Sequence, residues 1–178
     1  MLSSVRNTDP VGAIRLALER AEIGPKHVQD ALFGFERSFT APGLQDTARK
    51  AGLNCPAVSV SSSMRAVFFG AQSILTSDTE IVVVVGVDGR GTCALVLAAP
   101  EAIGRWNLSP RARLASRSMA GADAALKQAE VKPEEVTVVR QGEGGSRLIY
   151  EVLEELEKKK ARWGMVSINE LSLLMERL

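Results

Sequence analysis

Few side chains in this chain suit nucleophilic or acid–base chemistry. Its 178 residues include one histidine, His27, and two cysteines, Cys55 and Cys93. Their spacing matches no metal-ligand pattern, so we expect no metal site. A nucleophilic serine or cysteine needs a base close by. Because a single histidine serves at most one such site, the histidine count limits the chemistry that the chain can perform.

Three consecutive serines, Ser61, Ser62 and Ser63, precede an apolar pattern with helical spacing. One interpretation is a serine nucleophile at a helix N-terminus, where the helix dipole stabilises an oxyanion. The other is helix capping by Ser62 or Ser63. His27 belongs to another helix-and-turn segment, so we favour capping.

Cys55 stands before Pro56 at the start of a strand pattern, and Cys93 lies inside an apolar strand pattern. Both positions favour buried structural thiols, because unpaired cysteine is among the most buried residue types. His27 follows a Pro-Lys pair and is expected in a solvated turn.

Two arginines and a glycine-rich segment are candidate ligand-binding features. Arg65 and Arg147 each lie near the start of an expected helix, where they could contact a phosphate or an acyl thioester, or form a surface ion pair. Gly144 and Gly145 belong to Gly-Glu-Gly-Gly-Ser, whose backbone N–H groups could hold a phosphate. The segment lacks the Gly-Lys-Ser/Thr of a P-loop, so close helix packing is the interpretation we favour.

The composition is that of an ordinary globular protein. Hydrophobic residues make up 46% and charged residues 24%, and 22 basic against 21 acidic residues leave a net charge of +1. This balance gives no electrostatic reason to expect nucleic acid or anionic membrane as a partner. The longest apolar run, residues 81–87, is far shorter than the roughly 20 residues of a membrane span. The N-terminus has no signal-peptide pattern, so we expect a cytoplasmic protein.

Helix and strand patterns alternate along the chain, which predicts an α/β fold with mostly parallel or mixed sheets. The continuous β-branched run that starts at Ile81 predicts a central strand covered on both faces. Helices are expected over 11–22, 44–51, 63–75, 121–129 and 146–162, and strands over 31–35, 57–61, 81–85, 93–98, 112–116, 136–139, 165–168 and 171–175.

The chain contains an internal repeat. Residues 17–28 align with residues 125–136, and six of the twelve positions are identical. A second pairing places the helix of Arg65 over the helix of Arg147, each before an apolar strand. The first half has residues 29–62 between these blocks, whereas the second has only 137–144. We therefore expect two related halves, the second shortened by about one strand and one helix.

These segments, in their order along nearly the whole chain, resemble the thiolase superfamily. The matching stretches are Val28–Gly34, Asp46–Leu53, Ser62–Ala66 with Ala71–Ile74, Ile81–Gly86, Ala94–Leu97, Leu108–Leu114, Gly142–Arg147 and Trp163–Ile168 with Leu171–Glu176. The resemblance implies a thiolase-like fold: two related βαβ halves with mixed sheets and covering helices. We expect one compact domain over 1–178, with a first half over 1–104, a shortened second half over 105–178 and no loop insertion between the strands near Val87.

The resemblance also exposes departures at the family's catalytic positions. The family's nucleophilic cysteine corresponds to Val60, its histidine to Val139 and its second cysteine to Asn169. Claisen condensation or thiolysis needs a thiolate, an imidazole and a further acid or base. Valine supplies none of these groups. The family is an acetyl-CoA acetyltransferase-like acyltransferase, and whether this chain is an enzyme stays open at this point.

The resemblance then implies a thiolase-like pseudoenzyme that acts as a partner or scaffold subunit in acyl-CoA metabolism. Thiolases dimerise through the strand that corresponds to residues 57–61, so we expect a homodimer or a heterodimer with a thiolase-like subunit. The alternatives are an acyl-CoA-binding protein, with coenzyme A or an acyl-CoA as ligand, and a residual acyltransferase or thioesterase that uses Ser61, Ser62 or Ser63.

Overall fold

The structure is a computed structural model that describes residues 1, 3–7, 9–35, 43–88, 91–142 and 144–178. The chain forms two compact units, Met1–Pro110 and Arg111–Leu178. No helix among these residues is long and apolar enough to cross a membrane.

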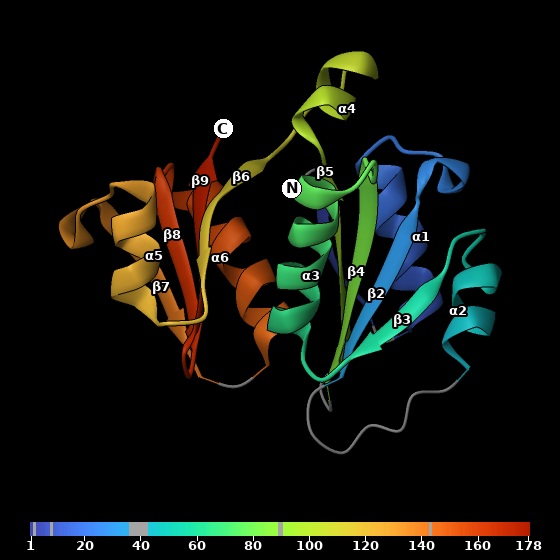
Figure 1. The fold of residues 1–178 in the computed structure, drawn as a ribbon, viewed down its shortest axis with the longest axis horizontal. Coiled ribbons are helices and arrows are strands. Elements are labelled where there is room, and N and C mark those ends of the chain that lie inside the picture. The colour runs from blue at the N-terminus through green and yellow to red at the C-terminus, as the bar shows by residue number, and fades with distance from the viewer. Residues whose placement is uncertain (2, 8, 36–42, 89–90, 143) are drawn as a thin grey trace. The chain divides into compact units, whose positions relative to one another are not determined.

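The described part of the first unit contains one mixed sheet of five strands (Figure 1). Strands β2, β3 and β4 run parallel, whereas β5 runs antiparallel to its neighbours β4 and β1. The sheet order is β1-β5-β4-β2-β3, so β3 is an edge strand. The strands are β1 (Ser3–Asn7), β2 (Asp30–Phe35), β3 (Ala57–Val60), β4 (Ile81–Asp88) and β5 (Gly91–Ala98).

Helices cover both faces of this sheet, with α1 on one side and α3 on the other (Figure 1). Ile81, Val83 and Val85 of β4 pack with α1 in the main core. Val82 and Val84 lie beneath Gly70 of α3 on the opposite face. This double coverage explains the continuous apolar run of β4. The helical elements are α1 (Pro10–Arg20), η1 (Pro25–His27), α2 (Leu44–Lys50), α3 (Ser63–Thr76) and α4 (Pro100–Arg105).

Side-chain caps determine where the two longest helices of the first unit begin. The Asp9 carboxylate accepts hydrogen bonds from the backbone N–H groups of Val11 and Gly12. At the start of α3, the Ser62 hydroxyl accepts from the Arg65 N–H at 3.2 Å. Such caps satisfy N–H groups that have no partner inside the helix. The predicted capping role of Ser62 is confirmed.

The start of α3 lies directly on β2 at Gly34. A Cβ atom built on Gly34 would lie 2.4 Å from both the N and Cα atoms of Ser63. These are backbone atoms, so no side-chain rotation relieves such a clash. Glycine therefore allows an approach that fixes the first turn of α3 over the sheet.

In the second unit, the described residues form a four-stranded sheet of order β6-β9-β8-β7, with α5 and α6 on opposite faces (Figure 1). Gly164 of β8 makes room for α6, because its Cβ would lie 2.6 Å from Val152 Cγ1. The elements are β6 (Ala112–Ser118), α5 (Ala122–Ala129), η2 (Pro133–Glu135), β7 (Val136–Gln141), α6 (Gly145–Lys159), β8 (Trp163–Ile168) and β9 (Leu171–Arg177).

The two units repeat one topology, as the internal repeat predicted. In the first unit, α1 and η1 connect β1 to β2, and β2 pairs in parallel with β4. In the second unit, α5 and η2 connect β6 to β7 in the same way, and β7 pairs in parallel with β8. In the described part of the second unit, no strand corresponds to β3 and no helix to α2. The predicted shortening of the second half is therefore confirmed.

The expected elements lie close to the observed ones, with two differences. Strand β1 reaches Asn7, beyond the residues 2–5 that the resemblance leaves for a first strand, because it pairs antiparallel with β5. Helix α4 follows Ala99 and was not expected, since its six residues include Pro100 and Gly104 and are too short to show a helical period.

Substituting Gly34 with alanine tests the contact between α3 and β2. We expect the variant to lose about 1–3 kcal/mol of unfolding free energy, the usual cost of forcing extra volume into a packed site. Gly104→Ala is the matched control, because nothing lies within 4 Å of its Cβ position. In the control, alanine replaces glycine in a helix, so stability should stay equal or rise by about 0.5–1 kcal/mol. Urea unfolding measures both, and equal stability of the two variants would contradict the contact.

Glu176 on β9 gives the second unit a stability that depends on pH. Burial raises the pKa of this carboxyl, but hydrogen bonds and charges from Arg162 and Arg113 outweigh burial and hold the pKa below its usual value. Arg113 Nη2 lies 2.5 Å from Glu176 Oε2, and Arg162 Nε lies 2.9 Å from Oε1.

A carboxyl with a depressed pKa stabilises the folded state above its unfolded pKa of about 4.3. That contribution disappears as the pH falls through the lower, folded pKa. We therefore expect Glu176→Gln to be less stable than wild type at pH 7 and the difference to shrink below about pH 4.5. Urea unfolding at a series of pH values measures it, and a difference that does not change with pH would refute the assignment.

Candidate functional site

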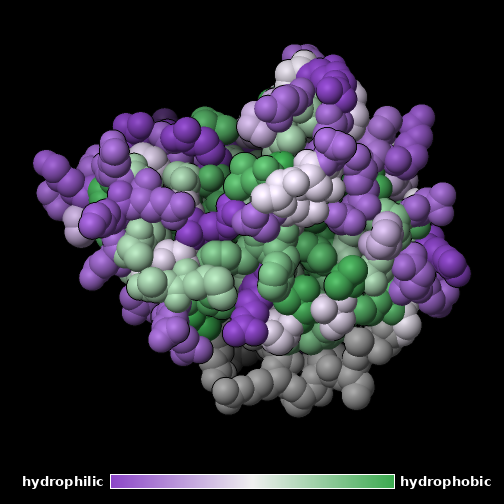
Figure 2. Space-filling model, in the orientation of Figure 1, coloured by the Kyte–Doolittle hydropathy of each residue, from purple (hydrophilic) through white to green (hydrophobic). Residues whose placement is uncertain are grey.

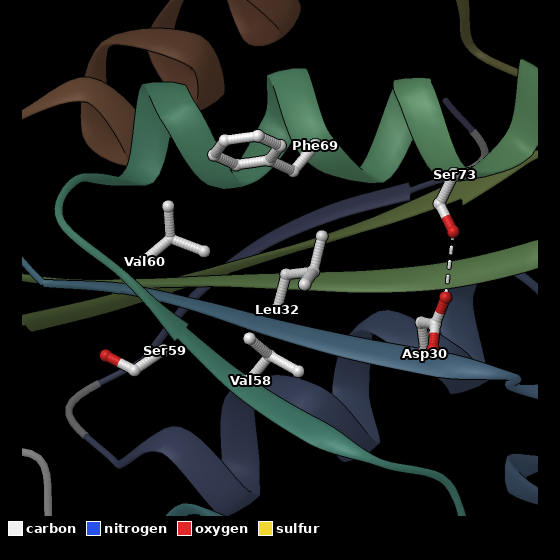
Figure 3. Close-up of a pocket in the computed structure, with 7 residues that line it drawn as sticks. All are labelled: Asp30, Leu32, Val58, Ser59, Val60, Phe69 and Ser73. Atoms are coloured by element: carbon white, nitrogen blue, oxygen red, sulfur yellow. Dashed lines mark hydrogen bonds between the residues drawn. The ribbon is translucent and has the colours of Figure 1, made fainter. Parts of the chain in front are cut away.

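The described residues of the first unit form a groove between strand β3 and helix α3, here called the β3–α3 groove (Figure 3). Its volume is about 380 Å³. This lies within the range of about 300–1,000 Å³ usual for binding sites. The lining residues are Asp30, Leu32, Val58, Ser59, Val60, Phe69 and Ser73.

The floor and wall of the groove are apolar. Leu32, Val58 and Val60 point from β2 and β3 toward α3, and Phe69 of α3 lies over them (Figure 3). Val58 is 49% exposed and Phe69 is 54% exposed, although both side chains are hydrophobic. Hydrophobic residues also gather over α3 and the neighbouring strands in the space-filling view (Figure 2). Beside this surface, β3 pairs only with β2 among the described strands.

One end of the groove carries a carboxylate. Asp30 Oδ2 accepts a hydrogen bond from Ser73 Oγ at 2.9 Å and lies 3.5 Å from Thr79 Oγ1 (Figure 3). No basic side chain in the described parts of the chain forms an ion pair with Asp30. The groove thus ends at a partly exposed carboxylate that, among the described residues, accepts hydrogen bonds from the hydroxyl groups of Ser73 and Thr79.

The three serines at the other end serve structural roles in the described contacts. Ser61 Oγ accepts a hydrogen bond from Arg65 Nη1 at 3.0 Å, and Ser62 caps α3. Ser63 is fully buried against Gly34. Arg65 is exposed and forms no ion pair within the described residues. The expected surface salt bridge of Arg65 is therefore not found there, whereas Arg147 lies 3.5 Å from Glu151.

The histidine and Cys55 lie at the opposite ends of the parallel strands from these serines. His27 precedes β2, whereas Gly34 near the end of β2 pairs with Val60. At about 3.3 Å per residue along the strands, His27 lies roughly 20 Å and Cys55 roughly 15 Å from the serines that follow Val60. His27 packs instead against Trp106, with ring centroids 4.9 Å apart. No histidine is therefore placed to activate a serine.

Both cysteines are buried, as predicted. Burial, with a smaller contribution from the negative charge of Asp30, raises the pKa of the Cys55 thiol. A raised pKa keeps the thiol protonated, and the thiolate is the nucleophilic form. Cys93 lies on β5 opposite Gly86, two strands away from β2. Three or more metal-binding side chains do not gather at any place among the residues described.

The second unit has charged residues at the position that corresponds to the β3–α3 groove. When α3 and α6 are aligned so that Arg65 matches Arg147, Phe69 corresponds to Glu151 and Ser73 corresponds to Glu155. Arg140 of β7 lies beside both glutamates and forms an ion pair with Glu155. Lys159 Nζ lies 2.8 Å from Glu155. The edge of this sheet is therefore covered by ion pairs, whereas the edge of the first is apolar.

The remaining candidate positions lie in the second unit. Val139 is on edge strand β7 and is 42% exposed. Asn169 occupies the turn between β8 and β9 with a φ of 53°. Gly144 has a φ of 82° and precedes α6, which begins at Gly145. The left-handed conformation of Gly144 gives this glycine a backbone role. Residue 143 of this segment lies outside the described residues.

Sequence reasoning anticipated part of the groove, because the strand expected over 57–61 supplies Val58, Ser59 and Val60. Of the two adjacent phenylalanines of α3, Phe69 is exposed and Phe68 is half-buried. Asp30 was not identified as a site residue. Its signal would have been a carboxylate at the start of an otherwise apolar strand.

No protein-family model matches the sequence, and no curated protein matches it either. Solved structures do match over essentially the whole chain. The Bacillus anthracis acetyl-CoA acetyltransferase aligns with a TM-score of 0.80 at 12% identity, over 100% of this chain and 98% of that chain. A thiolase of Ascaris suum, solved in complex with coenzyme A, gives 0.80 at 13% identity, over 99% of each chain.

Human mitochondrial 3-ketoacyl-CoA thiolase aligns with a TM-score of 0.83 at 10% identity, over 99% of this chain and 98% of that chain. At such low identities the alignments establish the fold and leave the activity undetermined. The order and directions of the strands, the repeated topology and these alignments agree with the expectation from the sequence. The chain has the thiolase-like fold.

Proposed function

We propose that this protein is a non-catalytic subunit of thiolase-like fold that binds another thiolase-like chain through the β3–α3 groove. The observation that carries the proposal is the half-exposed pair Val58 and Phe69 beside the outer edge of β3, which no other described strand pairs. The partner is a second copy or a catalytically complete thiolase-like chain, and the assembly serves acyl-CoA metabolism.

An open sheet edge beside exposed apolar side chains favours association. The unpaired N–H and C=O groups of an edge strand can pair with another chain, and proteins normally protect such edges with charges or bulges. The second unit has this protection, because Arg140, Glu151 and Glu155 cover the corresponding position. The first unit has Phe69 and Ser73 there. This difference between the two units supports a role for the first edge in binding a partner.

The absence of turnover is supported by the residues at the proposed catalytic positions. Val60, Val139 and Asn169 provide neither a thiolate nor an imidazole, and acyl transfer needs both. Cys55 cannot replace the nucleophile, because it is buried, has a raised pKa and lies at the far end of β3. The contacts of Ser61, Ser62 and Ser63 likewise give no support to a serine acyltransferase.

Coenzyme A fits the described residues poorly. Strand β4 ends at Asp88, which pairs with Gly91 of β5, so only two residues of the sequence lie between these strands. The loop insertion by which the family holds much of the coenzyme is therefore missing at this place. The described rim of the groove near Asp30 is negatively charged, which opposes binding of a phosphorylated ligand.

The substitution Val58→Arg tests the proposed interface. We expect Val58→Arg to raise the dissociation constant of the assembly at least about tenfold, because a charge would replace apolar surface within the contact. Val139→Arg is the matched control, since it changes an exposed valine on the edge strand of the other unit. Sedimentation velocity over a range of concentrations measures both variants, alone and mixed with thiolases of the same organism.

Equal effects of the two substitutions would contradict the proposed interface. A wild-type protein that stays monomeric in every mixture would contradict the proposed function itself.

The absence of turnover is tested with acetoacetyl-CoA and free coenzyme A. We expect no thiolysis above the buffer rate and the same thioester hydrolysis in wild type and in a Ser61→Ala, Ser62→Ala, Ser63→Ala variant. We also expect no change in unfolding temperature with coenzyme A, acetyl-CoA or a long-chain acyl-CoA. A ligand at a hundred times its dissociation constant would add about 2.7 kcal/mol of stability. Such a shift, or hydrolysis lost in the triple variant, would favour the acyl-CoA-binding or the serine-enzyme alternative.

A further inference from the structure

The carboxylate at the end of the β3–α3 groove has capacity for a further partner. Both hydrogen bonds that the described residues make to it, from Ser73 Oγ at 2.9 Å and Thr79 Oγ1 at 3.5 Å, end on Asp30 Oδ2. Within the same part of the chain, no donor reaches Asp30 Oδ1. A carboxylate accepts several hydrogen bonds, and Asp30 lines the groove, so a ligand there can donate to it (Figure 3).

An apolar row extends from Asp30 along the two strands. Leu32 follows two residues later on the same face of β2, and Val58 of β3 pairs with it. Val60 comes next, beside Gly34. At about 3.3 Å per residue, the row from Asp30 to Val60 is roughly 13 Å long. The groove therefore offers one charged end and an apolar length.

The second unit has a cationic side chain at the position of Leu32. An extension of the internal repeat along both chains of residues matches Leu32 to Arg140. The strand registers agree with this match, because Leu32 pairs with Val84 of β4 and Arg140 pairs with Val166 of β8. These two valines are themselves equivalent when α3 and α6 are aligned.

Arg140 lies beside the carboxylates of α6. Its Nε atom is 3.8 Å from Glu151, at the position of Phe69, and its guanidinium forms an ion pair with Glu155, at the position of Ser73. An arginine side chain combines an apolar stem with a charged head. In the second unit, a side chain of this character thus lies where the first unit has an open groove.

We propose that the β3–α3 groove binds a small hydrophobic amine, whose ammonium group pairs with Asp30 and whose apolar body lies on Leu32, Val58, Val60 and Phe69. The first unit has a carboxylate at this place, and none of its described basic side chains pairs with it. An ion pair beside apolar surface is stronger than one in open water, because the local dielectric constant is lower. The apolar row supplies affinity and the carboxylate fixes the orientation, as is usual in ligand sites.

The charge of Asp30 also selects against other ligands with an apolar body. A fatty acid or a phosphorylated ligand would bring a second negative charge to this end of the groove. The amine and the partner chain of the proposed function cover the same side chains, Val58 and Phe69, so the amine competes with assembly. This competition rests on the proposed function, whereas binding of the amine does not.

Three ligands with the same hydrocarbon chain test the role of charge in the wild-type protein: n-octylammonium, n-octanol and octanoate. We expect n-octylammonium to bind at least about tenfold more tightly than n-octanol, and octanoate to bind most weakly. Among n-alkylammonium ions, affinity should rise about two- to fourfold with each added methylene until the chain exceeds the groove. Similar affinities for the three ligands would overturn the proposal.

Heteronuclear NMR titrations measure these dissociation constants and locate the ligand. We expect the largest shift changes at the amides of β3 and at Phe69. Changes centred outside the groove would contradict the site, even if an amine binds.

Asp30→Asn keeps an oxygen for Ser73 but removes the charge. We expect this variant to bind n-octylammonium at least about tenfold more weakly and n-octanol as the wild type does. Asp46→Asn on exposed helix α2 is the matched control and should bind both ligands normally. Circular dichroism checks the fold of each variant. An unchanged affinity of folded Asp30→Asn for n-octylammonium would refute the ion pair.

Val58→Arg supplies a cation from the chain itself, as Arg140 does in the second unit. We expect this variant to lose binding of n-octylammonium, while Val139→Arg, on the edge strand of the other unit, retains it. Equal binding by the two variants would contradict the site. This pair tests the proposal independently of Asp30→Asn.

Sedimentation velocity with and without n-octylammonium separates this inference from the proposed function. If both hold, the amine raises the dissociation constant of the assembly in wild type and has a smaller effect in Asp30→Asn. Groove binding by a chain that never assembles would support the inference and overturn the proposed function. Assembly by a chain whose dilute, monomeric form binds no amine would overturn the inference and leave the proposed function in place.

Discussion

The contact between the first turn of α3 and Gly34 of β2 determines the geometry of the groove. The absence of a side chain at position 34 lets the backbone of Ser63 lie against the strand. From that anchor, α3 runs across the sheet with Phe69 over Val58 and Val60, and with Ser73 within hydrogen-bond distance of Asp30. A side chain at Gly34 would lift the start of the helix and alter every one of these contacts.

The two units share one topology but differ in the residues that cover the edge of the sheet. In the second unit, the loss of the strand and helix that correspond to β3 and α2 leaves β7 at the edge, and Arg140 with Glu151 and Glu155 gives that edge a charged cover. In the first unit, the edge strand is retained and the cover is apolar. Water stabilises charged side chains, so an edge covered by ion pairs remains exposed to solvent. Burial of exposed valine and phenylalanine side chains against another surface lowers the free energy, so an apolar edge favours association.

Much of the fold could be predicted from the sequence because its signals are local. The valine run of β4, the cap at Ser62 and the repeat of residues 17–28 each specify one element or its neighbour. Short elements such as α4 were missed, since six residues carry no period. The site was harder to predict, because Asp30 and Ser73 are 43 residues apart and meet only through the seating of α3 on the sheet. The positions that correspond to the family's catalytic residues were identified only through the resemblance, because a valine such as Val60 has no reactive group that could mark it as a site residue.

The most direct test of the account is hydrogen–deuterium exchange of the backbone amides in β3 and α3 at two protein concentrations, one below and one far above the dissociation constant found by sedimentation. We predict that those amides of β3 that neither pair with β2 nor donate to Gln45 exchange rapidly in the dilute sample and become protected in the concentrated one, while amides of β7 exchange equally in both. Exchange in β3 that does not depend on concentration, in the presence or absence of a thiolase-like partner, would contradict the claim that this edge binds another chain.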